Sequence, residues 1–397
     1  MKDMRPRVLI FTSSFPHRKN PVYGIFIRDF ALSLRSLCHV SVLAPRFDAD
    51  EEGIEGVSMR SFPQCCPPGC RLAGKPGGIL PALKRNPLLW LFLPFFLLSE
   101  LITLARVVKR DKIEIIHAHW LLPQGFIAAV YKRFFNRSIK LVITCHGSDV
   151  NKVSGGLMNR LKRFAVRHAD RVVAVSASLA EKVTLLCAGV RCEIQPMGIN
   201  TEQFSPAADS PDIRSLYSLK SAPVLFVGSL IELKGVRELV AAWPSVKASC
   251  PDAELLIVGN GELKQELSIQ ADSLGVGASV HFAGSVDHDA LPGYYSRSAL
   301  FVLPSHSEGF SLVTYEALAC GTATVVSRIP VFESLPEGER LFSFCEVGDS
   351  ESIARAIVGK LTNPGDTSYG RQYVCERLSQ RIVAERYSRF YSEVLNG

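Results

Sequence analysis

The 397-residue sequence lacks a hydrophobic run long enough to cross a membrane. Its most apolar uncharged segment, Leu88–Ser99, is 12 residues long, whereas a spanning helix needs about 20. Short-period repeats are absent as well. A composition of 47% hydrophobic and 21% charged residues excludes a collagen, a coiled coil and a disordered tail. The remaining class is a globular chain, and its length predicts two domains.

The charge is unevenly distributed along the chain. Residues 1–205 carry 29 Lys and Arg against 15 Asp and Glu, and the remainder carries 16 against 23. A basic half joined to an acidic half indicates two tasks, the basic one facing nucleic acid, phosphates or a membrane surface. Because no stacking-aromatic or groove-reading motif accompanies the basic residues, we expect no nucleic acid partner.

The 11 cysteines are odd in number, and the first residues lead directly into an apolar strand pattern rather than a signal peptide. Both features are typical of a cytoplasmic protein with reduced thiols, and this is the expected location. Cys65, Cys66 and Cys70 lie in a Pro/Gly-rich loop without a fourth ligand at zinc spacing, so a loop without metal is favoured there.

One apolar segment, Leu88–Ala105, is interrupted only by Glu100 and has cations on both sides: Lys84, Arg85, Arg106, Lys109 and Arg110. A helix with an apolar body and cationic ends can lie in a membrane interface. It can equally be a buried core helix, and the sequence leaves both interpretations open.

Short apolar runs typical of buried strands alternate with helix-period segments in two successive series. The runs are Val8–Phe11, Val40–Ala44, Ile113–His117, Leu141–Thr144, Val172–Val175 and Glu193–Gln195, then Val224–Val227, Leu255–Val258, Val280–Ala283, Leu300–Leu303 and Thr324–Val326. This alternation predicts two doubly wound α/β domains with parallel sheets. We expect an N-terminal domain over 1–205, a linker over 206–222, a C-terminal domain over 223–377 and a helical segment over 378–397 that returns to the N-terminal domain.

The densest group of polar residues follows the strand Leu300–Leu303. A helix is expected to begin near Phe310 or Ser311 and to end before Gly321. Its free first amides would suit an anion such as a pyrophosphate. Glu308 and Glu316 would then meet two ends of an extended ligand. The alternative is that Glu308 caps the helix dipole and Glu316 is a solvated helix residue.

A second loop, after Val224–Val227, places Lys234 at an expected helix start, where the dipole disfavours a cation unless a phosphate is bound. The simpler alternative is a surface lysine. A third loop contains Gly259 and Gly261, but Lys264 occupies the place of the last glycine of GxGxxG. This departure is evidence against a nicotinamide dehydrogenase.

In the basic half, polar residues come at the ends of two neighbouring strands: His117, His119, Trp120, His146 and Asp149. They are expected to line a polar pocket. A metal is disfavoured, since His-x-His straddles a strand end and has no third ligand nearby in sequence.

Several patterns occur together in the order known from one family: His117-x-His119-Trp120, His146-Gly147, Pro196-x-Gly198-Ile199-Asn200 with Phe204-x-Pro206, Val227-Gly228-x-Leu230 with Lys234-Gly235, Val258-Gly259-x-Gly261 and Glu308-x7-Glu316. The chain resembles the retaining nucleotide-sugar glycosyltransferases of the GT-B fold, the family of sucrose-phosphate synthase and bacterial mannosyltransferases. The resemblance covers essentially the whole chain. It implies two Rossmann-like domains that face each other across a cleft.

The resemblance also implies roles. Glu316 would bind the donor ribose and Glu308 the transferred sugar. Lys234 and the amides of Gly309, Phe310, Ser311 and Leu312 would hold the pyrophosphate, with Gly24 closing on it. Gly228 and Ser229 would belong to the same donor site, and residues after Gly259 and Gly284 would border the base. The expected catalytic residues are His119, His146, Glu308 and Lys234, with no metal or other cofactor.

One departure concerns Ser229, because the family often has an arginine beside the pyrophosphate there. The implied activity is transfer of a sugar, with retention, from a nucleoside diphosphate sugar to an acceptor hydroxyl. A lipid-linked or polysaccharide acceptor in bacterial envelope glycan assembly is expected, at an anionic membrane surface on the inner face of the plasma membrane. The alternatives are a soluble acceptor and a catalytically silent nucleotide-sugar-binding subunit.

Overall fold

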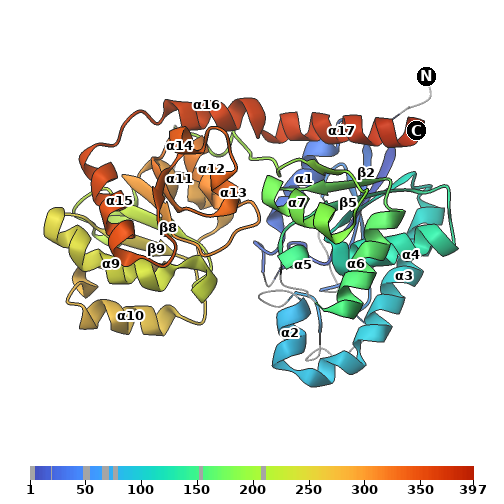
Figure 1. Cartoon of the computed structure of the whole chain (residues 1–397), viewed down its shortest axis with the longest axis horizontal. Helices are drawn as coiled ribbons and strands as arrows, with labels where there is room; N and C mark the ends of the chain where they lie inside the picture. Colours follow the sequence, from blue (N-terminus) through green and yellow to red (C-terminus); the bar gives the residue numbers. More distant parts are fainter. Residues whose placement is uncertain are drawn as a thin grey trace. The chain divides into compact units, whose positions relative to one another are not determined.

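The computed structural model describes residues 5–18, 20–47, 54–64, 71–74, 79–151, 155–206 and 212–397. The chain divides into two compact units, a first unit of Met1–Gly198 with Gln380–Gly397 and a second unit of Ile199–Ser379 (Figure 1). The loop with Cys65, Cys66 and Cys70 lies outside the described residues, as do residues 207–211 of the expected linker.

Seven strands in the described part of the first unit form one parallel sheet, in the order β3-β2-β1-β4-β5-β6-β7. Its central strands are apolar on both faces, as strands covered by helices on both sides must be. The strands are β1 (Arg7–Phe11), β2 (His39–Pro45), β3 (Val57–Phe62), β4 (Ile115–His119), β5 (Lys140–Cys145), β6 (Arg171–Ala174) and β7 (Cys192–Ile194).

Helices cover both faces of this sheet (Figure 1). They are α1 (Ile25–Leu34), α2 (Ile79–Arg85), η2 (Pro87–Leu91), α3 (Leu93–Arg110), η3 (Leu121–Gly125), α4 (Phe126–Phe134), α5 (Ser148–Asn151), α6 (Gly156–His168), α7 (Ala177–Leu186) and α17 (Gln380–Asn396). The last of these, α17, packs beside α1 and buries Tyr387 and Tyr391 in the first unit.

The apolar segment Leu88–Ala105 forms η2 and most of α3, and its side chains are partly buried and partly exposed. One face of α3 is core, with Phe96 and Leu104 fully buried against β3 and α4. The other face of α3, together with η2, leaves large apolar side chains exposed: Leu88, Trp90, Leu91, Phe95, Leu98 and Ile102. Among the helices of the described chain, none is both long and apolar enough to span a membrane.

The second unit contains, in its described residues, a six-stranded parallel sheet of order β10-β9-β8-β11-β12-β13. Its strands are β8 (Val224–Val227), β9 (Leu255–Val258), β10 (Val280–Gly284), β11 (Leu300–Leu303), β12 (Thr324–Ser327) and β13 (Ser343–Cys345). Its helices are α8 (Ile213–Tyr217), η4 (Glu232–Lys234), α9 (Val236–Ser249), α10 (Lys264–Ser273), η5 (Gly277–Ser279), η6 (His288–Ala290), α11 (Leu291–Ser296), α12 (Leu312–Ala319), α13 (Pro330–Glu333), α14 (Gly338–Leu341), α15 (Ser350–Thr362) and α16 (Ser368–Arg377).

The division between the units lies at residue 198, earlier than the expected boundary after residue 205. Ile199 donates its amide to the carbonyl of Leu378 and pairs with Ser379, which ties residues 199–206 to the second unit. Part of the expected linker is also structured, because α8 lies there and the Tyr217 hydroxyl is 2.8 Å from that of Tyr294.

Candidate active site

Three histidines form one cluster at the carboxyl ends of β4 and β5. His119 is the last residue of β4 and His146 directly follows β5; His119 Nδ1 lies 2.9 Å from His146 Nε2. His117 stacks on His119 with ring centroids 4.4 Å apart. Its ring nitrogens lie 2.7 Å from the hydroxyls of Tyr391 and Thr144. Neighbouring parallel strands therefore bring the predicted His119 and His146 together.

The strand that carries two of these histidines begins and ends two residues later than expected. β4 spans Ile115–His119 rather than Ile113–His117. His119 is consequently part of the sheet and fully buried, where the prediction placed it in the loop beyond the strand.

All three imidazoles are neutral at physiological pH. Burial lowers the pKa of His146 to about 3, and burial together with the nearby His146 lowers the pKa of His117 to about 3. Burial, with His117 and His146, also lowers the pKa of His119 well below its ordinary value. The Nε2 of His119 is buried and has no hydrogen-bond partner among the described residues. A neutral imidazole with an unused nitrogen can bind a hydroxyl as donor or acceptor, according to its tautomer.

Asp149 has a different position from the one expected. Its carboxylate is buried and accepts hydrogen bonds from the amides of Leu121, at 2.7 Å, and Gly147, at 3.0 Å. Burial raises the pKa of Asp149, and these hydrogen bonds oppose the rise. The residue thus holds the loops after β4 and β5 together and positions Trp120 and His146, rather than lining an open pocket.

In the second unit, Lys234 and Glu308 form an ion pair between the loops after β8 and β11. Lys234 Nζ lies 2.6 Å from Glu308 Oε1, and Ser305 Oγ donates to the same oxygen at 2.7 Å. Lys234 is the last residue of η4 and precedes the start of α9 at Val236. Glu308 bonds to a lysine and a serine and does not cap a helix, so the capping alternative is wrong. The lysine is likewise not a simple surface lysine.

Glu316 lies in the middle of α12 and is 6% exposed, so it is not a solvated helix residue. The Tyr295 hydroxyl donates to its Oε2 at 3.0 Å, and His288 Nε2 lies 3.4 Å from its Oε1. Burial, and to a smaller extent the adjacent Glu316, raises the pKa of Tyr295 well above its usual value. The sequence contained no signal for these two partners, because neither Tyr295 nor His288 belongs to a recognisable motif.

The segment Gly309–Leu312 leads into α12, which begins at Leu312, one residue later than expected. Ser311 occupies the N-cap position with φ 72° and does not cap the helix with its side chain; its Oγ lies 2.8 Å from Thr314 Oγ1. Phe310 stacks on Tyr315 at 4.5 Å. No side chain of the described chain therefore caps the first amides of α12, and such amides can bind an anion.

The predicted glycines lie where backbones approach closely. Gly259 has φ 137°, and a Cβ there would be 1.9 Å from the carbonyl oxygen of Gly228. Its amide donates to the carbonyl of Gly284 at 2.7 Å, so the loops after β8, β9 and β10 meet, with Ser229 in the first of them. In the first unit, a Cβ on Gly24 would come within 2.6 Å of the Ser14 backbone.

The predicted residues thus fall into two groups. The first unit carries Gly24, His119 and His146. The second unit carries the others: Gly228, Ser229, Lys234, Gly259, Gly284, Glu308, Gly309, Phe310, Ser311, Leu312 and Glu316. Most of these residues lie in loops or helix starts that follow parallel strands, the usual ligand edge of such sheets. His119 and Gly284 end strands, and Glu316 lies inside α12.

Comparisons with known proteins place both units in enzyme families. Residues 24–203 match the family described as Glycosyltransferase Family 4, and residues 214–372 match Glycosyl transferases group 1. N-acetyl-alpha-D-glucosaminyl L-malate synthase of Bacillus anthracis is 27% identical over 303 residues, 74% of this chain and 78% of that protein. A GDP-mannose-dependent alpha-(1-6)-phosphatidylinositol monomannoside mannosyltransferase of Mycolicibacterium smegmatis is 25% identical over 335 residues, 81% and 80% of the two chains.

A teichuronic acid biosynthesis glycosyltransferase of Bacillus subtilis, itself described as putative, is 32% identical over 250 residues; the match covers 62% of this chain and 60% of that protein. Among solved structures, sucrose-phosphate synthase from Thermosynechococcus elongatus superposes with a TM-score of 0.79 at 21% identity, covering 99% and 100% of the two chains. Anabaena Alr3699/HepE in complex with UDP-glucose gives 0.74 at 18% identity, covering 98% and 99%.

Two parallel-sheet Rossmann-like units with these structural relatives define the GT-B fold. The chain belongs to the GT-B glycosyltransferases.

Proposed function

We propose that this glycosyltransferase moves a sugar from a nucleoside diphosphate sugar to an acceptor hydroxyl with retention at the anomeric carbon. The observation that carries the proposal is the Lys234–Glu308 pair in the second unit, beside the uncapped start of α12. The reaction separates charge, because the sugar becomes cationic while the diphosphate leaves as an anion. Fixed donors aimed at the departing charge are the largest source of catalysis in such a site.

In this proposal Lys234 and the amides of residues 309–312 bind the diphosphate. Glu308 would accept hydrogen bonds from hydroxyls of the sugar, once the bound diphosphate attracts Lys234 away from Glu308. Glu316 would accept hydrogen bonds from the ribose hydroxyls, and Tyr295 would orient the Glu316 carboxylate. The complex of Anabaena Alr3699/HepE with UDP-glucose supports a donor of this class. In the first unit, the neutral His119 and His146 would hydrogen-bond sugar or acceptor hydroxyls.

Retention would follow from front-face attack, with the leaving phosphate taking the proton of the acceptor. No metal step is required, since Lys234 and the helix amides supply the positive charge. A silent nucleotide-sugar-binding subunit is disfavoured because Lys234 and Glu308 are present as a bonded pair and Glu316 is present with Tyr295 bonded to it.

A screen of nucleotide sugars, read by thermal stabilisation and by hydrolysis, tests the donor assignment. The donor identified should lose stabilisation in Lys234→Ala and Glu316→Ala and keep it in the exposed controls Lys220→Ala and Glu351→Ala. NMR of the product anomer tests retention. Unchanged donor binding in both site variants would overturn the assignment.

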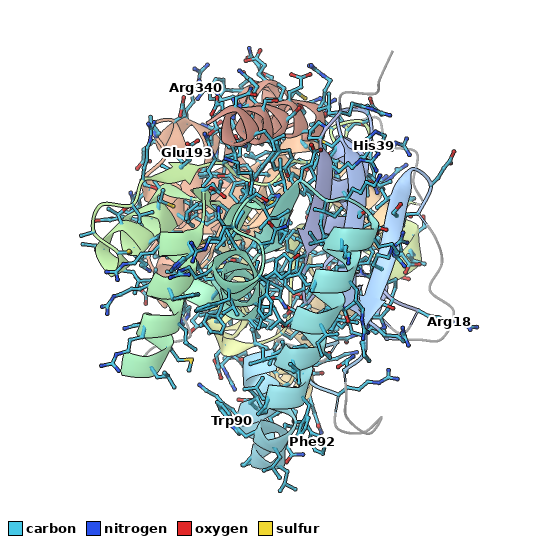
Figure 2. All side chains as sticks on the ribbon, turned by 90° about the vertical axis from the view of Figure 1, so that its right-hand side faces the viewer. Arg18, His39, Trp90, Phe92, Glu193 and Arg340 are labelled. Carbon is cyan, nitrogen blue, oxygen red and sulfur yellow. The ribbon has the colours of Figure 1, made fainter. Side chains whose placement is uncertain are left out.

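We further propose that the acceptor is a lipid-linked or polysaccharide substrate of envelope glycan assembly, met at an anionic membrane on the inner face of the plasma membrane. The exposed side chains of η2 and α3 support this, with Lys84 and Arg85 at the end of α2 beside them. In Figure 2, Trp90 and Phe92 lie at one extremity of the view. Apolar side chains beside cations are what binding to an anionic bilayer interface requires.

Sedimentation with anionic vesicles at low salt tests the membrane part. The double variant Trp90→Ser/Leu91→Ser should lose vesicle binding, whereas Ile269→Ser, which removes an equally exposed apolar residue of α10, should retain it. A wild-type protein that stays entirely in the supernatant would instead favour a soluble acceptor.

A further inference from the structure

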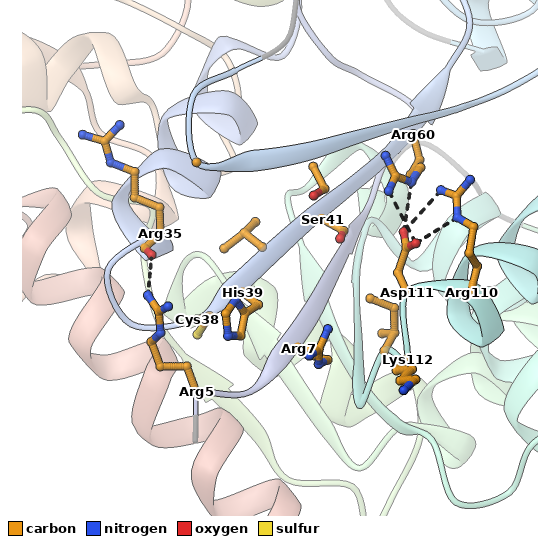
Figure 3. Close-up of a pocket in the computed structure, with 14 residues that line it drawn as sticks. Arg5, Arg7, Arg35, Cys38, His39, Ser41, Arg60, Arg110, Asp111 and Lys112 are labelled. Carbon is orange, nitrogen blue, oxygen red and sulfur yellow. Dashed lines mark hydrogen bonds and ion pairs between the residues drawn. The ribbon is translucent and has the colours of Figure 1, made fainter. Parts of the chain in front are cut away.

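A basic pocket lies at the opposite edge of the first sheet from the histidine cluster. It is lined by the amino-terminal ends of β1 and β2, the start of β3 and the segment between α3 and β4, and its volume is about 580 Å³ (Figure 3). The histidines lie at the carboxyl ends of β4 and β5, so this pocket is separate from the proposed active site.

The charge of the lining is strongly one-sided. Six cationic side chains contribute to it: Arg5, Arg7, Arg35, Arg60, Arg110 and Lys112. Asp111 is the one carboxylate in the lining, and it is shared between Arg60 and Arg110, at 2.9 Å from each. Within the described residues, no carboxylate pairs with the side chain of Arg7, Arg35 or Lys112. The pocket therefore holds several like charges in one concave site, which only an anion would balance.

Lys112 provides a second, independent observation. It follows α3 with φ 51°, in the left-handed region. This position after a helix normally favours glycine, because a side chain there is disfavoured sterically. The chain nevertheless places a lysine at the wall of the pocket, and strained positions of this kind concentrate at functional sites.

We propose that this pocket binds a soluble ligand carrying two or more phosphoryl groups. Guanidinium groups match phosphate oxygens with paired hydrogen bonds. The lining contains no Phe, Tyr or Trp side chain, so recognition rests on the phosphoryl groups and not on a stacked base. The volume is within the range of small-molecule sites.

A phospholipid headgroup offers the same chemistry, but the geometry favours a soluble source. Arg110 ends α3 at the pocket, whereas Trp90 and Leu91 precede the start of α3 at Leu93. The 18-residue helix separates the two by about 25 Å at 1.5 Å per residue. Figure 2 likewise shows His39, a residue of the pocket lining, far from Trp90. A membrane bound at the exposed apolar side chains would thus leave the pocket accessible to solutes.

Calorimetric titration with inorganic triphosphate at fixed ionic strength tests the site. The full-length Lys234→Ala variant is the background, because it removes the proposed phosphate contact of the donor site. We expect binding to persist there and to weaken by at least about tenfold when Arg7→Gln and Lys112→Gly are added. The exposed Arg137→Gln is the matched control and should change nothing. Equal affinity with and without the pocket substitutions would overturn the proposal.

Two further measurements complete the test. Lys112→Gly alone should leave the Tm unchanged or raise it, because glycine accepts a left-handed backbone; weaker binding then reflects the lost charge and not misfolding. The pocket variants should still bind anionic vesicles like the wild type. Loss of vesicle binding with unchanged triphosphate binding would overturn the soluble source. A failure of the donor assignment is seen in a separate measurement. In that case Lys234→Ala would keep the transferase activity of the wild type, whatever its affinity for triphosphate.

Discussion

The two units differ in the partners of the ionisable groups at their candidate sites and in their cores. In the first unit, the histidine cluster and Glu100 are buried with neutral partners; Glu100 is bonded by the amide of Gln124 at 2.8 Å, and burial raises its pKa well above the ordinary range. In the second unit, Glu308 is paired with a lysine. The histidine cluster of the first unit is thus uncharged, whereas the second unit has an ion pair, which the proposed diphosphate donor would need.

The largest expected effect comes from removing the charged Lys234–Glu308 pair of the second unit. Lys234→Ala should lower kcat by about 100-fold, because a preorganised donor to the leaving diphosphate is lost. Steady-state kinetics with the donor found in the screen measures it. Lys220→Ala is the control, and a Lys234→Ala enzyme within a few-fold of the wild type would contradict a charged role.

The second prediction concerns the acid sensitivity of the neutral histidine cluster in the first unit. The folded pKa of His117 and of His146 is depressed to about 3, so their contribution to stability is present above the unfolded value near 6.5 and is lost as the pH falls toward 3. The folded pKa of His119 is also well below 6.5, so the three should together cost about 3 kcal/mol of unfolding free energy between pH 6.5 and 5.5.

Denaturant unfolding at the two pH values measures this loss. His146→Gln should remove about a third of it, while His306→Gln, which changes a partly exposed histidine of the second unit, should leave it intact. Identical acid sensitivity in the wild type and His146→Gln would show that the cluster is not buried in its neutral form.

A third, smaller effect involves the buried carboxyl of the first unit. Glu100 Oε2 and Gln124 Oε1 are buried without hydrogen-bond partners in the described structure. The raised folded pKa of Glu100 means that its stabilising contribution is complete at low pH and is lost as the pH rises through that pKa. Glu100→Gln should therefore add about 1 kcal/mol to the unfolding free energy at pH 8 and much less at pH 4. A variant less stable than the wild type at pH 8 would contradict this.

The smallest effect sharpens the role of Glu316. Tyr295→Phe removes one hydrogen bond to its carboxylate and should raise the donor KM about threefold with little change in kcat. Tyr294→Phe, which instead breaks a bond to Tyr217, is the control. A fall in kcat with an unchanged KM would move Glu316 from donor binding to the chemical step.

The sequence predicted the fold well where strands are apolar on both faces. All five expected strands of the second unit are present, and Val224–Val227, Leu255–Val258 and Leu300–Leu303 match to the residue. It missed β3 and β13, which lie at sheet edges. In β3, Ser58, Met59, Arg60 and Ser61 are partly or fully exposed, so the strand lacks a continuous apolar run.

The contacts around the candidate site residues were predicted less completely than the fold. Motifs indicated His119, His146, Lys234, Glu308 and Glu316, because strand-end position and spacing are written in the sequence. The roles of these residues stay a prediction. Contacts between distant segments are not. Tyr391 reaches His117 from 274 residues away, and Tyr295 reaches Glu316 from another helix. Such partners follow from packing, which no local pattern encodes.

The position of α17 has a consequence for synthesis on the ribosome. Tyr391 bonds His117, and Tyr387 bonds Thr144 at 3.2 Å, yet both tyrosines are translated after the whole of Ile199–Ser379. The second unit can close as soon as its own residues emerge. The first unit must wait, with α1 and the histidine strands exposed, until the last helix is released. A nascent chain that stalls before residue 380 would therefore hold an assembled second unit and an unfinished histidine cluster.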